Sequence, residues 1–527
     1  MKENNKGSLD AWLAMSVIII GTFMSILSSS IINVALPKMM SVFGVSLDDI
    51  KWVMTAYTLA LGAVIPITAY LQEIFGAKKV YTFALAMFTI GSALCGFAWS
   101  NSSMIAFRVF QAIGGGMMQP VGMAIIYSIF PREKIGLALG VYGIAAMAAP
   151  AIGPTLGGLI IEKMDWRLIF SVNFPIGVIG VILAILLLKD EPRKPFKSFD
   201  IIGFLSSTIG IVSVLYVLGK WSTIDWGDIK NPILLTVGCL SLVLFVVNEL
   251  THPDPLLDLR VLKLFDFSVS LVITSVLTLA LMGGSYVLPL FLQNVRGYTA
   301  METGLIMLPA ALVMGVLMPV SGALFDKLGA KPVVIPGLII LAVSSFELST
   351  AINMNSTKES IMLISCIRSI GMGLAMMPIS TVGMNAVKGE MIPKASALNN
   401  TIRQIASSLS ITIMTVLIQS KTNYNYSKLS EQITIYNKAA NDTISTLTKM
   451  YMHSGLPQGT AKVSALSQIA KMIQAQAYLD AMAYSVAVTA AIVVVAILLT
   501  LLMRSNKKVK KPKVEGKLNE GGAAVLE

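Results

Sequence analysis

The chain has 527 residues, of which 55% are hydrophobic and 13% charged, and its mean hydropathy is +0.76. A soluble domain cannot bury so much apolar surface, so lipid is the expected solvent. The formal net charge of +12 needs no nucleic acid partner, because basic loops and a basic tail beside an anionic lipid leaflet explain it. Two histidines, and the absence of zinc, nucleophile-elbow and Walker motifs, speak against an enzyme and indicate no metal site.

Hydrophobic stretches of about 20 residues recur along the chain, each long enough to cross a hydrocarbon core of about 30 Å as a helix. They predict an all-α integral membrane protein of fourteen transmembrane helices. The expected spans lie near residues 11–36, 52–72, 80–98, 103–130, 135–160, 168–188, 200–219, 231–250, 266–292, 302–323, 332–352, 361–386, 395–419 and 478–503. The cysteines Cys95, Cys239 and Cys366 fall inside these spans without a pairing pattern, so no disulfide framework is expected.

Loop charges predict the orientation. With the N-terminus inside, the inner short loops hold roughly 16 Lys and Arg and the outer loops roughly 8, as cytoplasmic loops should. Both termini are therefore expected on the cytoplasmic side of a bacterial cell membrane. The first span lacks a signal-peptide cleavage site, so it is expected to stay in the protein.

Two loops repeat one pattern. The loop after the second span runs from Ala69 to Lys79, and the loop after the tenth runs from Gly322 to Lys331, with matching positions. Duplicated bundles are common in transporters, which place the substrate between the two copies. The predicted division is an N-terminal six-helix bundle at 1–189, a linker with two inserted helices at 190–263, a C-terminal six-helix bundle at 264–503 and a basic cytoplasmic tail at 504–527.

A polar segment at 420–477 interrupts the second bundle and carries apolar residues at helical spacing, including Ile444, Leu447 and Met450. We expect an external helical hairpin here. A linker without fixed structure is the alternative, and a partner that binds this segment is unknown.

Several motifs resemble the fourteen-helix drug:proton antiporter branch of the major facilitator superfamily. They are the two repeated loops, the fourth-span sequence Arg108-Val-Phe-Gln111-Ala-Ile-Gly114, the fifth-span sequence from Ala149 to Gly158 and the entry to the sixth span from Asp165 to Gly177. The resemblance implies two six-helix bundles with two inserted helices. It also implies proton-coupled, cofactor-free efflux of hydrophobic or cationic small molecules by alternating access, as in multidrug resistance.

The same resemblance assigns roles to particular residues. The repeated loops are expected to gate the inner side; their residues are Glu73, Gly76, Lys78, Gly322, Asp326, Gly329 and Lys331. A solvated turn is the alternative for either loop. The first copy departs from the family pattern at Ala69 and Glu73, so a weaker gate is expected there, although its carboxylate remains. A pliable hinge is expected in the fifth span at Pro150, Gly153, Pro154, Gly157 and Gly158.

Proton coupling is harder to place, because Ser28 stands where the family usually has an acidic residue. Serine can bind neither a proton nor a cation, so coupling uses another group or the cargo is not strongly cationic. Arg108 and Glu347 are the main candidates for proton coupling, and the gate carboxylates Glu73 and Asp326 are further candidates. Glu347 is expected to be the only acidic residue well within a span, although a place at the outer interface is equally open.

Scattered polar side chains are expected to line a cavity between the bundles; they are Ser28, Asn33, Tyr57, Gln111, Gln119, Tyr286 and Gln293. Many of the 31 methionines offer pliable apolar surface for varied cargo, although such residues more often serve as packing. Two alternatives stay open: export of a lipid, a peptide or a metabolite, and a membrane sensor that transports nothing. The sequence does not identify cargo, stoichiometry or oligomeric state.

Overall fold

The computed structural model describes residues 2–131, 134–190, 198–221, 224–434 and 436–503, and every regular element in these ranges is a helix. Fourteen helices of the described residues are long and apolar enough to cross a membrane. The fold class predicted from the sequence is therefore confirmed. The basic tail and most of the charged junction after the sixth span lie outside the described residues.

The first six spans use nine helical elements: α1 (Lys2–Phe43), α2 (Leu47–Val64), η1 (Ile65–Ile67), α3 (Thr68–Phe75), α4 (Ala77–Gly96), α5 (Asn101–Ile129), α6 (Ile135–Lys163), α7 (Leu168–Ser171) and α8 (Asn173–Leu187). The second span consists of α2, η1 and α3, because Pro66 lacks an N–H and tightens the helix locally. The inserted pair is α9 (Ile201–Lys220) and α10 (Lys230–Thr251).

The last six spans and the hairpin comprise η3 (Leu259–Lys263), α11 (Phe265–Leu290), the π-helical η4 (Phe291–Val295), α12 (Ala300–Leu328), α13 (Lys331–Ala351), α14 (Lys358–Asn385), η5 (Gly389–Met391), α15 (Ile392–Ser430), α16 (Lys438–His453) and α17 (Gln458–Leu502). Side-chain caps begin several of them. Ser100 and Thr299 each form a capping box, with Ser103 and Glu302 respectively, which satisfies free backbone N–H groups.

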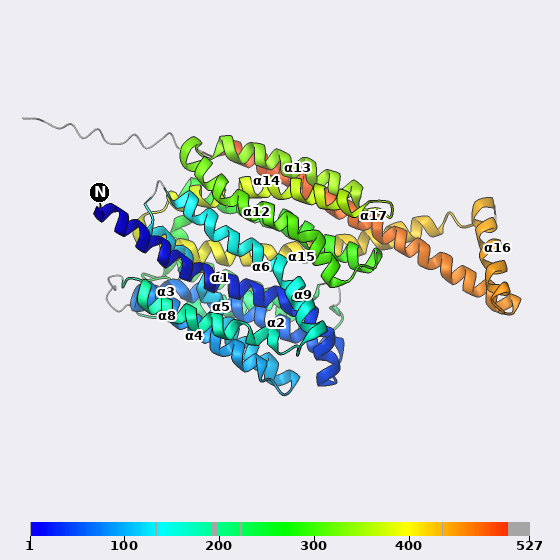
Figure 1. Ribbon diagram of the computed structural model, residues 1–527, viewed down its shortest axis with the longest axis horizontal. Helices are drawn as coiled ribbons and strands as arrows, with labels where there is room; N and C mark the ends of the chain where they lie inside the picture. The colour runs from blue at the N-terminus through cyan, green and yellow to red at the C-terminus, as the bar shows by residue number, and fades with distance from the viewer. Residues whose placement is uncertain (1, 132–133, 191–197, 222–223, 435, 504–527) are drawn as a thin grey trace, which may run out of the picture.

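Two bundles lie side by side. Helices α1, α2, α4, α5, α6 and α8 pack among themselves, as do α11, α12, α13, α14, α15 and α17. The bundles meet where α6 runs along α12 and where α5 and α3 face α15 (Figure 1). Inserted helix α9 packs on both α2 and α15, so it covers the seam between the bundles on that side.

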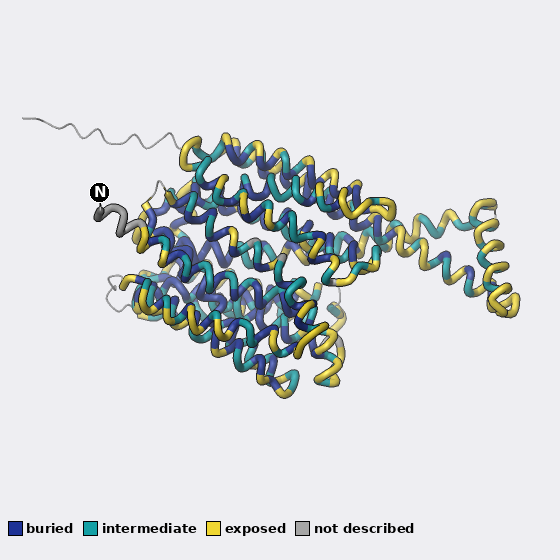
Figure 2. The backbone as a smooth tube through the Cα atoms, in the orientation of Figure 1, coloured by how far each residue is buried: buried dark blue, intermediate teal, exposed yellow. Residues whose placement is uncertain are grey.

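The molecule has two distinct ends. The N-terminus lies at one end, and α16 projects from the other (Figure 1). We call them the terminus end and the hairpin end. α15 continues to Ser430, past the boundary expected near 419, and α17 begins at Gln458, before the boundary expected near 478. Together with α16 these extensions form a largely exposed projection (Figure 2).

Candidate functional site

A polar cluster lies inside the first bundle, around an arginine on α5. Arg108 is 1% exposed, and its Nη1 donates hydrogen bonds to Ser28 Oγ at 3.0 Å and to Gln111 Oε1 at 2.8 Å. Gln111 Nε2 in turn donates to Ser92 Oγ at 2.6 Å and to Ser28 Oγ at 3.2 Å. The guanidinium carbon lies 3.9 Å from the centre of the Tyr57 ring, at cation–π distance. Helices α1, α2, α4 and α5 thus each contribute to one buried network.

The sequence predicted four of these five residues as site candidates and missed Ser92. A serine in an apolar helix carries no distinctive signal, because hydroxyls are usually satisfied by the preceding turn. Ser92 Oγ does this as well, donating to Phe88 O at 2.9 Å.

A second polar contact joins the two bundles. Arg403 of α15 donates from Nη2 to Gln119 Oε1 of α5 at 2.7 Å and to Asn400 Oδ1 at 2.9 Å. Closer to the terminus end, Ser396 Oγ donates to Pro120 O at 2.9 Å. Gln119, predicted as a cavity residue, therefore takes part in closing the bundles against each other.

The repeated loops adopt the same backbone turn. Gly76 and Gly329 both have φ +86°, in the left-handed region that glycine tolerates best. Gly76 directly follows the end of α3, and Gly329 directly follows the end of α12. This turn explains why both copies of the repeated pattern have a glycine at this position.

The second loop makes contacts across the bundles. A Cβ added at Gly136, in the first turn of α6, would lie 2.7 Å from Asp326 Oδ1 of α12. The carboxylate therefore lies at a helix N-terminus, where the backbone dipole favours negative charge. Lys331 Nζ donates to Leu501 O at 2.9 Å, which ties α13 to the end of α17.

The first loop has different contacts. Lys78 Nζ lies 4.0 Å from Asp190 Oδ2, in a partly exposed ion pair. Glu73 is half-buried on α3, the helix that faces α15 across the bundles. The weaker gate expected for this copy stays a prediction.

The glycines of the fifth span allow close helix packing. A Cβ at Gly153 would lie 2.1 Å from Ser30 Oγ of α1, and one at Gly157 would lie 3.1 Å from Ile31 O. Pro150 and Pro154 stand within α6, and Gly158 faces Met301 of α12 more loosely. The motif brings α1 and α6 together beside the Ser28 cluster, and its role as a hinge stays a prediction.

Other candidates do not join the polar cluster. Asn33 and Gln293 are exposed, and Tyr286, half-buried in the second bundle, accepts a hydrogen bond from Thr415 Oγ1 at 3.1 Å. Glu347 is exposed one turn before the end of α13, which favours the interfacial alternative.

One buried acidic residue near the end of a span was not singled out from the sequence. Glu249 of α10 is fully buried, and its Oε2 accepts a hydrogen bond from Leu257 N at 3.0 Å. The chain folds back over the end of α10 and covers this carboxylate, which hydropathy alone does not reveal. The indication available from the sequence was that Glu249 falls inside the span expected at 231–250.

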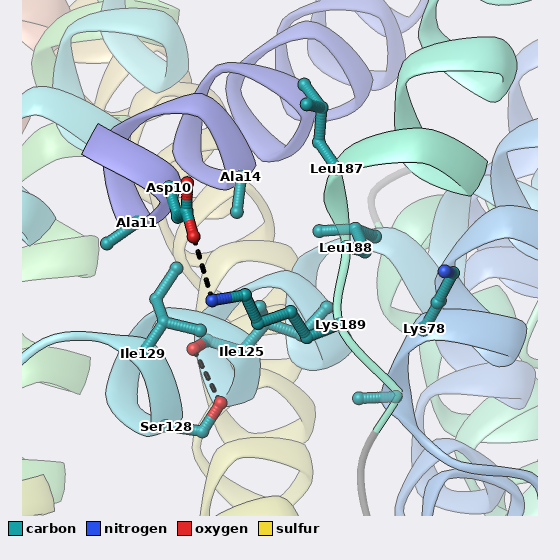
Figure 3. Close-up of a pocket in the computed structure, with 11 residues that line it drawn as sticks. Asp10, Ala11, Ala14, Lys78, Ile125, Ser128, Ile129, Leu187, Leu188 and Lys189 are labelled. Carbon is teal, nitrogen blue, oxygen red and sulfur yellow. Dashed lines mark hydrogen bonds and ion pairs between the residues drawn. The ribbon is translucent and has the colours of Figure 1, made fainter. Parts of the chain in front are cut away.

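A cavity of about 280 Å³ opens at the terminus end of the first bundle, not midway between the bundles. Figure 3 shows Lys189 on one side of it, donating from Nζ to Asp10 Oδ2 at 2.9 Å, with Lys78 nearby. These charged groups lie at a helix-end surface, so the cavity differs in place and lining from the one expected between the bundles.

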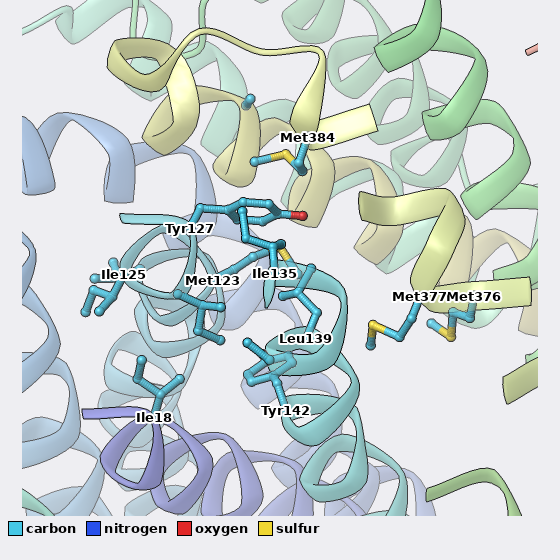
Figure 4. Close-up of a cluster of buried hydrophobic side chains, with 14 of the residues drawn as sticks. Ile18, Met123, Ile125, Tyr127, Ile135, Leu139, Tyr142, Met376, Met377 and Met384 are labelled. Atoms are coloured by element: carbon cyan, nitrogen blue, oxygen red, sulfur yellow. The ribbon is translucent and has the colours of Figure 1, made fainter. Parts of the chain in front are cut away.

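Between the bundles, apolar side chains fill much of the space. Met123 and Tyr127 of α5, Tyr142 of α6 and Met377 of α14 belong to one buried cluster (Figure 4). Methionine is flexible and polarisable, so this surface can repack when the bundles separate. In this conformation the methionines serve as packing, and a methionine-rich lining for cargo stays a prediction.

Comparison with known proteins decides the family. The family model described as Major Facilitator Superfamily matches residues 18–411. The chain belongs to the major facilitator superfamily. It is accordingly a small-molecule membrane transporter and not an enzyme, and superfamily members take energy from an ion gradient in place of a cofactor.

Relatives within the superfamily include export proteins. The chain is 40% identical to an uncharacterised MFS-type transporter, YhcA of Bacillus subtilis, over 79% of this chain and 78% of that protein. It is 30% identical to the lincomycin resistance protein LmrB of Listeria monocytogenes, over 74% and 84% of the two chains. It is 29% identical to the multidrug export protein EmrB of Escherichia coli K12, over 82% and 85%.

A solved superfamily structure shares the fold at low sequence identity. The proton:xylose symporter XylE aligns with a TM-score of 0.59 at 12% identity, over 95% of this chain and 97% of that one. This likeness supports the two-bundle architecture and says nothing about cargo.

Proposed function

We propose that this chain exports hydrophobic small molecules from a bacterial cell by alternating access, in exchange for protons. The observation that carries the proposal is the closed contact between the bundles at the terminus end. There Ser396 meets Pro120, and Asp326 lies at the start of α6. Such contacts join the two bundles, so breaking and remaking them would open one side of a central site at a time.

The direction of transport is supported by the relatives, whose names describe multidrug export and lincomycin resistance. Orientation is supported by the loop charges, which assign the terminus end to the cytoplasm. Both termini are then cytoplasmic, and the closed contact blocks the cytoplasmic side in this conformation. The surrounding lipid is the other partner.

The coupling group is proposed among Arg108, the gate carboxylates Glu73 and Asp326, and Glu347. Arg108 is the strongest candidate by position, because it lies buried among three other helices. Glu347 is the weakest, because its side chain is exposed.

Transport into inside-out membrane vesicles tests the proposal. With an imposed proton gradient, a neutral hydrophobic dye is expected to accumulate, with proton release, in vesicles that contain the protein. A protonophore is expected to abolish this accumulation. Accumulation that survives the protonophore would reject proton coupling. If neutral, cationic and anionic dyes all fail to accumulate, the sensor alternative replaces export.

A further inference from the structure

The buried charge in the first bundle has no counterion. Among the described residues, no carboxylate lies within ion-pair distance of Arg108. Its partners are Ser28, Gln111, Val53 O and the rings of Tyr57 and Phe170. All of these partners are neutral. Serine at position 28 thus leaves a full positive charge uncompensated where a carboxylate side chain would neutralise it.

The same imbalance extends across both bundles. Arg368 of α14 is half-buried and bonds to Ser345 Oγ at 3.3 Å and to Ala280 O, while Arg403 bonds to Gln119 and Asn400. None of these partners is acidic. In the part of the chain that the structure describes, the buried carboxylates are Asp200 and Glu249.

Both buried carboxylates lie far along the molecule from Arg108. Asp200 caps the start of α9 and accepts a hydrogen bond from Asn248 Nδ2 at 2.6 Å, at the terminus end. Arg108 lies two turns from the start of α5, toward the hairpin end. These carboxylates therefore do not offset the positive charge of the bundle interior.

An unpaired charge inside a membrane protein is costly, and membrane proteins keep such groups where they act on a ligand or an ion. Neutral dipoles and the Tyr57 ring offset part of this cost. The Arg108 guanidinium also has unused hydrogen-bond donors, because no described residue accepts a hydrogen bond from Nη2. A carboxylate or phosphate oxygen would complete its charge-assisted hydrogen bonding.

We propose that Arg108, Ser28 and Gln111 form an anion site, and that the exported molecule carries an acidic group which binds there. This rests on the proposed export function and narrows its cargo to amphipathic anions such as carboxylates, sulfonates or phosphate esters. Ser28, Tyr57 and Arg108 are buried and lie on three different helices, α1, α2 and α5, so the site opens to a ligand only when these helices move apart. The methionine-rich surface between the bundles accommodates the apolar part of the cargo.

Binding of matched probes tests the site directly. The full-length protein in lipid nanodiscs is titrated with three fluorescent probes of one scaffold: dansylglycine, its neutral amide and a dansyl-linked quaternary ammonium. We expect dansylglycine to bind about tenfold more tightly than the amide, as one charge-assisted interaction provides, with the cation weakest. Equal affinities, or tightest binding of the cation, would overturn the proposal.

Substitutions of Ser28 and Arg108 test whether the preference for the anionic probe arises at this site. Ser28→Asp places a carboxylate beside Nη1, where Ser28 Oγ now lies at 3.0 Å, so it should remove the anion preference by pairing internally. Ser28→Asn is the matched control; it adds similar volume without charge and should keep the preference. Arg108→Gln should remove it as well. A preference that survives both Ser28→Asp and Arg108→Gln would place the anion elsewhere and reject this site.

Two further experiments distinguish the source of the bound anion and separate the anion site from the proposed export function. If excess inorganic phosphate displaces dansylglycine from the wild type but leaves the amide bound, the anion site is supported, and free phosphate replaces the acidic group of the cargo as its ligand. If phosphate fails to displace dansylglycine, the acidic group of the cargo is supported as the ligand. Vesicle accumulation of the neutral amide tests export independently. Export without anion preference would reject the anion site alone, whereas anion preference without any export would reject the proposed function alone.

Discussion

Gln111 connects the charged and hydroxyl parts of the buried cluster. Its amide oxygen accepts from Arg108, and its amide nitrogen donates to Ser28 and Ser92. Both ends of the amide are thus used, and the side chain is fully buried. A glutamine at this position orients the guanidinium without neutralising it, which is what an anion site requires.

Gln111→Leu is expected to destabilise the protein, because it leaves buried donors and acceptors unpaired at a cost of about 1–3 kcal/mol. Thermal unfolding of the purified protein in detergent should show a midpoint several degrees below that of the wild type, by an order-of-magnitude conversion. Gln293→Leu is the control, because Gln293 is exposed. Equal midpoints for the two variants would show that the network contributes little to stability.

Residue types with a distinctive cost in a membrane could be predicted from the sequence. Arg108 and Gln111 stood out because polar side chains are rare in spans, and Ser28 stood out against a family pattern. Ser92 and Glu249 were missed for different physical reasons. The hydroxyl of Ser92 is compatible with any helix, and the burial of Glu249 depends on a chain reversal near Leu257 that local hydropathy does not encode.

At the scale of helices, α6 and α12 approach so closely that side chains are excluded at one point. A Cβ at Gly322 would lie 1.9 Å from Gly136 O, far inside any real contact. This pair of glycines lies at the terminus end, beside Asp326. The first glycine of the repeated loop therefore permits closure of the bundles, in addition to any role in the turn.

Gly322→Ala is expected to prevent full closure at the terminus end and to lower transport about tenfold or more, since the clash is with rigid backbone. Gly315→Ala on the same helix is the matched control, because its Cβ would meet Ile144 at an ordinary 3.7 Å. Initial rates in vesicles, at equal amounts of protein, measure the effect. Equal rates for both variants would mean that α6 and α12 separate easily and that this contact is not a gate.

The turn glycines allow a separate test of local strain. Gly329→Ala forces alanine into the left-handed region at φ +86°, at a cost of about 1–2 kcal/mol. We expect a lower unfolding midpoint than for the wild type. Gly389→Ala should leave the midpoint unchanged, because no other group lies within 4 Å of its Cβ and its φ is not positive. An unchanged midpoint in Gly329→Ala would show that the loop relaxes without cost.

Helix number was predictable because each span must be long and apolar, but helix ends were not. The sequence expectation stopped the thirteenth span near 419, whereas α15 continues to Ser430 through a polar stretch. Helix α17 likewise begins at Gln458, well before its apolar part. Outside lipid, packing between α15 and α17 replaces hydropathy as the determinant of helix length.

On the scale of the whole molecule, the inserted helices and the hairpin are additions to two similar bundles. Thr412 Oγ1 of α15 donates to Leu218 O of α9 at 2.7 Å, and Trp52 of α2 stacks on Tyr216 of α9 at 5.7 Å between ring centres. Helix α9 therefore contacts both bundles toward the hairpin end. It closes the lateral seam there, which favours cargo exchange along the axis over exchange with the lipid on that side.

The hairpin is expected to be dispensable for transport itself. Helix α16 has no buried residue, and it packs on α17 but makes no comparable contact with the bundles. Replacing residues 431–457 with a short glycine–serine linker keeps the contact between α15 and α17. Vesicle transport by this variant should stay within about twofold of the wild type, because exposed loop tips tolerate replacement.

Resistance of whole cells to an exported toxic compound gives the second measurement for the same variant. Unchanged vesicle transport with reduced cell resistance would indicate that the exposed surface of α16, including Tyr436 beside it at 89% exposed, binds a partner outside the membrane. Unchanged values in both assays would leave the hairpin without a role in export. Loss of vesicle transport would contradict the prediction, because it would mean that the projection moves with the bundles and stabilises one of their conformations.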